Sequence, residues 1–501
     1  MLNTRTPLLA LLVGSSLLAC AGDAGEQAAT DEGTTVVVDM PLSSSSEAAM
    51  THYREGQHAL DMGRVIDANV HFAAAVEADP SFALGHLRVA NTANSADEFI
   101  SGLEAAEANA EGASDAERLE IEITRQGLEN NSEGQLRLAQ QLVEGQPESA
   151  RAQLILAGVQ AGMRQMAEAR ASALRATELA PDFAPAYGFL GNSYIFNQPK
   201  DFDRAVENMR RVVELAPDEP NSHDFLGDAL RAQNDLVGAR DAYTRAHELA
   251  PEDASPVQQR GHVNSFLGDF DAARADYDQS IGLSRAGQGP SFAVYRALVS
   301  VHAEDPAAAV SELTGLASSI DEQDVPGKLG LKVFALTTAA QVALHHDMLD
   351  DAAAILDQRA TLNLEQAEVV GGDAVMRGTQ ANNAYWAGVL AARGGDHAGA
   401  AARAQEAMAL LEPDANPTRN EPAHDLMALS SLLQGDHEGS IGHYAQANLD
   451  NVYNQYHLAL AHEAAGNAAE AQSLLESVVY NNFNSPGYAL IRNDVRSRLG
   501  M

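Results

Sequence analysis

The chain is 501 residues long and 45% hydrophobic, which is enough apolar material for an extended core. Its 70 acidic and 32 basic residues give a formal net charge of −38. A field of that sign repels nucleic acid phosphates and anionic lipid headgroups, so both are poor partner classes, whereas cationic partners or divalent ions are attracted.

The first 19 residues have the pattern of a targeting segment. Arg5 supplies a positive start, and an apolar run from Pro7 to Leu18 follows it. The run is too short to span a bilayer comfortably. It ends in Leu17-Leu18-Ala19-Cys20, which resembles a bacterial lipobox. The resemblance implies cleavage before Cys20 and a lipid attached to that cysteine, the only one in the chain.

Two destinations follow from these residues. In lipoproteins of this kind, a residue other than Asp after the cysteine implies sorting to the outer membrane, and here Ala21 follows. We therefore expect a bacterial envelope lipoprotein facing the periplasm. The alternative is that Ala19-Cys20-Ala21 serves as an ordinary signal peptidase site, which would release a soluble periplasmic or secreted protein. Residues 20–48, rich in small and acidic residues, are expected to form a flexible tether.

A repeat of about 34 residues then runs through residues 49–485. It is clearest in 220–253, where Gly227, Ala239, Tyr243, Ala246 and Pro251 alternate small, large and helix-ending positions. Each unit predicts two helices, and neighbouring hairpins must stack to bury their apolar faces. The other units with this order are 49–82, 150–183, 184–219, 254–287, 421–451 and 452–485.

This period and order of residues resembles the tetratricopeptide repeat. The resemblance implies an all-α fold, a right-handed α-solenoid of about ten or eleven helix-turn-helix repeats. Residues 83–149 and 288–420 are expected to be degenerate repeats, and residues 486–501 a C-terminal capping helix. The resemblance also implies that the protein binds other proteins and does not catalyse a reaction.

No catalytic or metal-binding motif stands out. Gly327-Lys328 lacks the spacing of a phosphate-binding loop, and the pattern H-E-x-x-H is absent. His457 and His462 are five residues apart, so they fall on different faces of a helix. We therefore expect no enzyme activity, no cofactor and no metal.

The remaining candidate site is the concave groove that the first helix of each hairpin lines in arrays resembling this one. The helical phase places nine residues in that groove: Asn192, Ile195, Phe196, Asp224, Asp228, Arg231, Gln258, His262 and Phe266. Some arrays of this family use lysines to clasp a partner's carboxylates, but here the groove is acidic. A neutral or basic protein segment is therefore the expected partner.

Two other interpretations stay open. Trp386, the only tryptophan, lies near Asn382, Asn383 and Tyr385 in the irregular stretch 288–420, and such groups can hold a sugar in an envelope enzyme or ligand-binding protein. Alternatively the chain is a structural spacer that associates with copies of itself, because solenoid ends without a polar cap can stack.

Overall fold

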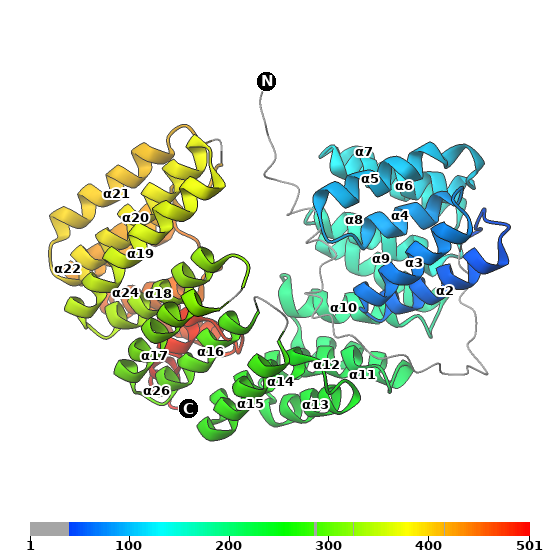
Figure 1. Cartoon of the computed structure of the whole chain (residues 1–501). Helices are drawn as coiled ribbons and strands as arrows, with labels where there is room; N and C mark the ends of the chain where they lie inside the picture. The colour runs from blue at the N-terminus through cyan, green and yellow to red at the C-terminus, as the bar shows by residue number, and fades with distance from the viewer. Residues whose placement is uncertain (1–39, 285–287, 324, 415) are drawn as a thin grey trace. The chain divides into compact units, whose positions relative to one another are not determined.

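The computed structural model describes residues 40–284, 288–323, 325–414 and 416–501, which are helices and connecting turns (Figure 1). The lipobox, Cys20 and most of the expected tether lie outside this range.

The helices before residue 254 are α2 (Glu47–Asp61), α3 (Val65–Ala78), α4 (Ala83–Asn91), α5 (Ala96–Ala108), η2 (Ala110–Gly112), α6 (Asp115–Leu128), α7 (Ser132–Gly145), α8 (Ala150–Gly162), α9 (Met166–Leu179), α10 (Ala184–Phe196), α11 (Phe202–Leu215), α12 (Pro220–Ala232) and α13 (Leu236–Leu249). Those that follow are α14 (Ala254–Leu267), α15 (Phe270–Leu283), α16 (Gly289–His302), α17 (Pro306–Ser319), η3 (Ile320–Glu322), α18 (Lys328–His345), α19 (Leu349–Val370), α20 (Asp373–Arg393), α21 (His397–Leu411), α22 (Glu421–Gln434), α23 (His437–Tyr444), α24 (Val452–Ala465), α25 (Ala468–Val479) and α26 (Pro486–Arg498).

Consecutive helices pair as antiparallel hairpins that stack on their neighbours, which confirms the α-solenoid. The described residues contain twelve hairpins, α2/α3 to α24/α25, rather than ten or eleven. The additional hairpins lie in the stretches 83–149 and 288–420, where few residues match the repeat pattern. In 288–420 the helices α18, α19 and α20 have 18, 22 and 21 residues, so they depart from the 34-residue period that sequence inspection follows.

Small residues let the two helices of a hairpin approach closely. At Gly227 in α12, a methyl group would lie 2.5 Å from Cε1 of Tyr243 in α13. Gly191 meets Met209 in the same way, and Gly56 meets Phe72. The alternation of small and large residues in the sequence is therefore the packing pattern of the hairpins.

Many second helices of the hairpins begin at an aspartate that caps the helix. The side chains of Asp235, Asp269, Asp305, Asp396 and Asp436 each accept a hydrogen bond from a backbone N–H three residues later. A carboxylate at this position satisfies an unpaired donor and interacts favourably with the helix dipole. Part of the strong acidity of the chain is thus structural.

The chain forms two compact units, which meet in sequence between Pro256 and Val257. In unit 1, residues up to 256, the turn between α2 and α3 reaches α12. The amide of Asn221 donates to the carbonyl of Met62 at 2.9 Å, and Arg64 pairs with Glu219 at 3.3 Å. Distant repeats of this unit therefore touch.

The end of the expected tether is anchored in unit 1. The backbone N–H of Ser43 donates to Glu117 in α6 at 3.0 Å, and the side chain of Met40 is buried. Residues 40–46 thus lie against the first repeats instead of extending freely as expected for 20–48. Among the described residues, no helix combines the length and the apolar character needed to cross a bilayer.

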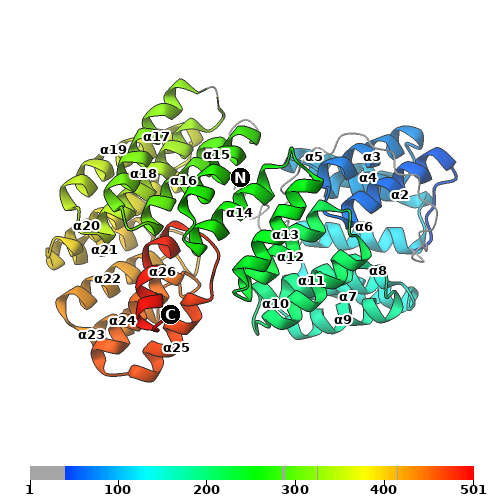
Figure 2. The same cartoon turned by 90° about the horizontal axis from the view of Figure 1, so that it is seen from below.

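In unit 2, residues 257–501, helix α26 turns back onto earlier helices. It packs on α16, α18, α24 and α25, as Figure 2 shows for α16 and α24. Tyr488, Ile491 and Val495 of α26 are fully buried in the core of the unit. The expected capping helix 486–501 therefore covers several helices of unit 2 as well as its last hairpin.

Candidate functional site

The first helices α10 and α12 of unit 1 lie side by side and carry six of the predicted groove residues. On α10, Phe196 is 56% exposed and Asn192 is half-buried, whereas Ile195 is buried. One turn before Asn192, the space beside Gly188 is open, with no atom within 4 Å of an added methyl group. This part of α10 is accessible to a partner.

On α12, two predicted residues form an internal network. The hydroxyl of Tyr243 and the guanidinium of Arg231 both donate to Oδ1 of Asp228, each at 2.7 Å. Arg231 is buried, and its guanidinium carbon lies 5.8 Å from the centre of the Tyr243 ring. Asp228 and Arg231 therefore neutralise one another on α12, and their contacts with Tyr243 join α12 to α13.

Asp224, one turn earlier on α12, is in a different position. Its Oδ1 is shielded from solvent and has no hydrogen-bond partner among the described residues. Burial raises the pKa of Asp224 well above its ordinary value, and the carboxylates of Asp228 and Asp253 raise it further. The nearby Arg231 lowers this pKa, but by less than burial and the two carboxylates raise it.

Three predicted groove residues belong to α14 of unit 2, where the two aromatic rings are enclosed. Gln258 is half-buried. Nδ1 of His262 lies 2.5 Å from the hydroxyl of Tyr277 and 3.0 Å from the amide of Asn484. Phe266 is 5% exposed, with ring centres of His302 and Tyr488 at 5.5 and 5.6 Å.

The groove predicted from helical phase thus divides into exposed and buried residues. Phe196, Asn192 and the α12 carboxylates are at least partly exposed. Ile195, Arg231, His262 and Phe266 are buried, so they are not available to a partner in this structure. Helical phase predicts which face of α14 carries His262 and Phe266. It does not predict that Tyr488 of α26, and Asn484 just before that helix, cover this face.

The residues considered for a sugar site in 288–420 are occupied by protein contacts. The buried guanidinium of Arg359 donates to Oδ1 of Asn383 at 2.9 Å, to Oδ1 of Asn382, and to the hydroxyl of Thr337 at 2.7 Å. Burial lowers the pKa of Arg359 to about 10. The two asparagines therefore solvate a buried arginine.

The aromatic residues beside them are also part of the packing. The hydroxyl of Tyr385 donates to Asp425 at 2.5 Å, and its ring meets Trp386 edge to face at 5.2 Å. Trp386 packs against the core of unit 2, and the Arg359 guanidinium lies 5.8 Å from its ring. The geometry thus accounts for these residues without a ligand.

Tetratricopeptide repeat models match residues 200–254 and residues 255–286. These residues, which contain α11 to α15, are tetratricopeptide repeats, and helical hairpins make up most of the other residues that the structure describes. No curated protein matches the chain.

Solved structures with a similar arrangement include yeast Tom70, at 15% identity over 90% of this chain and 91% of that one, with a TM-score of 0.41. A second is YrrB, described as a TPR protein with an unusual peptide-binding site, at 20% identity over 39% of this chain and 96% of that one, with a TM-score of 0.30. A third is a MamA RS-1 double mutant, at 19% identity over 34% of this chain and 95% of that one, with a TM-score of 0.31.

Proposed function

We propose that this chain is a non-enzymatic scaffold or adaptor that binds a segment of a partner protein on α10 and α12 of unit 1. Tetratricopeptide repeats and proteins built from them point to protein–protein interaction. The observation that carries the proposal is the combination of an exposed Phe196 with the unpartnered carboxylate oxygen of Asp224 on adjacent first helices.

The chemistry of this surface favours a neutral or basic segment. Phe196 offers an exposed ring to an apolar side chain, and aromatic residues are frequent anchors at interfaces. Asp224 has two further carboxylates nearby, so a lysine, an arginine or a free amino terminus is the matching group. The net charge of −38 also favours encounter with a positively charged partner.

We further propose that the protein is held at the cell envelope by a lipid on Cys20, facing the periplasm of a bacterial outer membrane. The support is the lipobox-like sequence Leu17-Leu18-Ala19-Cys20 followed by Ala21. Metabolic labelling with a fatty acid should mark the wild-type chain and not Cys20→Ser. A label that persists in the variant, or a wild-type chain that is never labelled, would contradict the anchor.

Affinity capture from envelope extract tests the binding surface. The full chain is compared with a double variant, Phe196→Ala with Asp224→Asn. The matched control is Val237→Ala with Asp241→Asn, which makes the same kinds of change at exposed residues of the second helix α13. A partner retained by wild type and control but lost by the groove variant supports the proposal.

The captured partner then allows a direct measurement. Its binding segment, made as a peptide, should bind the wild-type chain, and the association rate should fall as salt is raised, because salt screens the attraction between a basic segment and a chain of net charge −38. Equal binding by the groove variant and the control would place the interaction elsewhere on the chain. In that case self-association, measured as a mass that grows with concentration in light scattering, becomes the next explanation.

A further inference from the structure

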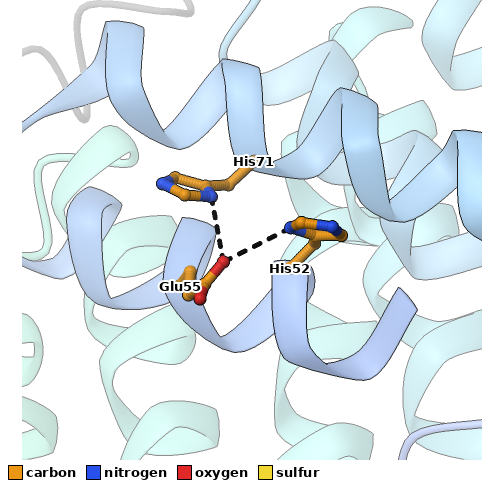
Figure 3. Close-up of side chains that lie close together, drawn as sticks. All are labelled: His52, Glu55 and His71. Atoms are coloured by element: carbon orange, nitrogen blue, oxygen red, sulfur yellow. Dashed lines mark ion pairs between the residues drawn. The ribbon is translucent and has the colours of Figure 1, made fainter. Parts of the chain in front are cut away.

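Two histidines and a glutamate converge at the outer edge of the first hairpin. His52 and Glu55 lie on α2, and His71 lies on α3 (Figure 3). Nδ1 of His52 is 3.3 Å from Oε2 of Glu55, and Nδ1 of His71 is 3.2 Å from the same oxygen. Within the described ranges, this is the one group of three such side chains whose ligand atoms all lie within 4.8 Å of one another.

The packing of the hairpin holds these groups opposite each other. Gly56 follows Glu55, and Phe72 follows His71, in the sequence. A methyl group on Gly56 would lie 2.8 Å from Cδ1 of Phe72, which is fully buried. Because this contact leaves no room for the helices to slide, it also fixes the register of Glu55 and His71 one residue away.

We propose that His52, Glu55 and His71 form a binding site for a divalent transition metal, with zinc as the best fit. Two ligand atoms about 2.0 Å from a tetrahedral zinc ion lie about 3.3 Å apart. The two nitrogen-to-oxygen distances already have this value. The Nδ1 atoms of His52 and His71 are at most 4.8 Å apart, so they must approach each other by at most about 1.5 Å to reach the distance that zinc requires. Rotation of these surface side chains permits that movement.

The donor set selects the class of metal. Imidazole nitrogens suit zinc and its neighbours, whereas calcium and magnesium prefer oxygen ligands only. Nδ1 of His52 makes no hydrogen bond among the described residues, and its ion-pair partner, the Glu55 carboxylate at 3.3 Å, is another ligand of the proposed site, so the nitrogen is available to a metal. A bound cation would lie between this nitrogen and the Glu55 oxygen and accept a lone pair from each.

The exposure of the site leaves room for a fourth ligand. The side chains of His52, Glu55 and His71 are 42%, 48% and 38% exposed. Three protein ligands with an open position are typical of zinc sites that also hold water or another molecule. The metal would join α2 to α3 and so stabilise this hairpin, independently of any partner bound on α10 and α12.

Equilibrium dialysis of the full, untagged chain against Zn²⁺ tests the site. All samples carry Cys20→Ser, so that the single thiol of the chain cannot contribute. We expect one tightly bound equivalent in this background. His71→Gln and Glu55→Gln should each weaken binding by about 100-fold or more, since loss of even an outer-shell partner costs 10–100-fold. His58→Gln, an exposed histidine on the same helix, should bind as the background does.

A second measurement separates a built site from loose surface binding. Zinc should raise the melting temperature of the background chain and of His58→Gln, but not of His71→Gln, because a ligand that binds only the folded state stabilises it. The helical circular dichroism signal of all variants should stay the same, since the three side chains are partly exposed. Binding that survives His71→Gln, or a melting temperature that zinc does not change, would overturn the proposal.

Discussion

Gly227 of α12 lies directly against the ring of Tyr243 of α13, and this contact connects the packing of the hairpin to the carboxylates of α12. A methyl group at Gly227 would lie 2.5 Å from Cε1 and 2.7 Å from Cδ1 of the ring. The same ring carries the hydroxyl that donates to Asp228, which in turn accepts from Arg231. The residue that brings α12 and α13 together therefore also sets the position of the α12 carboxylates.

Gly227→Ala should lower the free energy of unfolding by about 1–3 kcal/mol, because the added methyl overpacks the hairpin. Gly158→Ala in α8 is the matched control, since no atom lies within 4 Å of its added methyl. The control should be neutral or stabilise by up to about 1 kcal/mol, because alanine favours a helix. Urea unfolding of both variants measures the difference. Equal stabilities would mean that the α12/α13 contact can relax at no cost.

Arg231→Glu should lower the free energy of unfolding by about 3–5 kcal/mol, the usual cost of breaking a buried ion pair. The new carboxylate would face Asp228 and Asp224 without a countercharge. Arg240→Glu in α13 provides the control, because that side chain is exposed and its nearest carboxylate is 3.9 Å away. Loss of partner capture by Arg231→Glu would thus report unfolding rather than a lost contact. A folded, fully stable Arg231→Glu chain would contradict the network.

Phe266→Ala should destabilise unit 2 by about 3–5 kcal/mol, as expected for a large aromatic residue removed from a core. The Phe266 ring contacts Tyr488 of α26, and the Arg492 guanidinium lies 4.8 Å from its centre. Phe196→Ala changes the same residue type at an exposed position and should leave stability within about 0.5 kcal/mol of wild type. Hydrogen exchange should show the loss of protection in residues 257–501. Loss confined to residues before 257 would be inconsistent with this packing.

The free energy of unfolding should depend on pH, because three histidines are buried. Burial lowers the pKa of His302 and of His457 to about 4 and that of His345 to about 3, each below the ordinary value of 6.5. The unfolded chain therefore binds more protons than the folded chain below about pH 6.5, so stability contributed by the neutral histidines is lost as the pH falls toward about 4. Asp425, whose pKa burial raises to about 6, and Asp224, whose pKa burial raises well above its ordinary value, act in the opposite direction and offset part of this loss.

Urea unfolding between about pH 7 and about pH 4.5 should show this loss, on the order of a few kcal/mol for the three histidines. His457→Gln removes one of them and should flatten the slope, even though it lowers stability at neutral pH by removing the 2.9 Å contact with the carbonyl of Tyr453. A slope in His457→Gln as steep as in wild type would mean that His457 can be protonated in the folded state.

The hairpins were predictable because their signals are local. Gly227 and Tyr243, or Gly56 and Phe72, lie one helix apart in the sequence, so a 34-residue period reveals them. The long helices α18 to α20 depart from that period, and the number of hairpins was underestimated as a result.

The sequence did not reveal the burial of several predicted groove residues or the histidine cluster of α2 and α3, for two physical reasons. The burial of Phe266 depends on Tyr488, more than two hundred residues later, and no pattern within a repeat indicates which segment returns to cover a face. The triad His52, Glu55 and His71 combines ligands from two helices, whereas the motif H-E-x-x-H looks for two histidines on one helix. A search for H-x-x-E on one helix with a histidine at the facing position of the next would have found it.

The return of α26 has a consequence for the order in which the chain folds during synthesis. Most contacts of unit 1 join successive hairpins, so its repeats have their partners soon after they leave the ribosome. The rings of His262 and Phe266 must wait for Asn484 and Tyr488, which are made more than two hundred residues later. Until then unit 2 exposes aromatic surface, and this is the interval in which a chaperone, or an unwanted neighbour, has access to it.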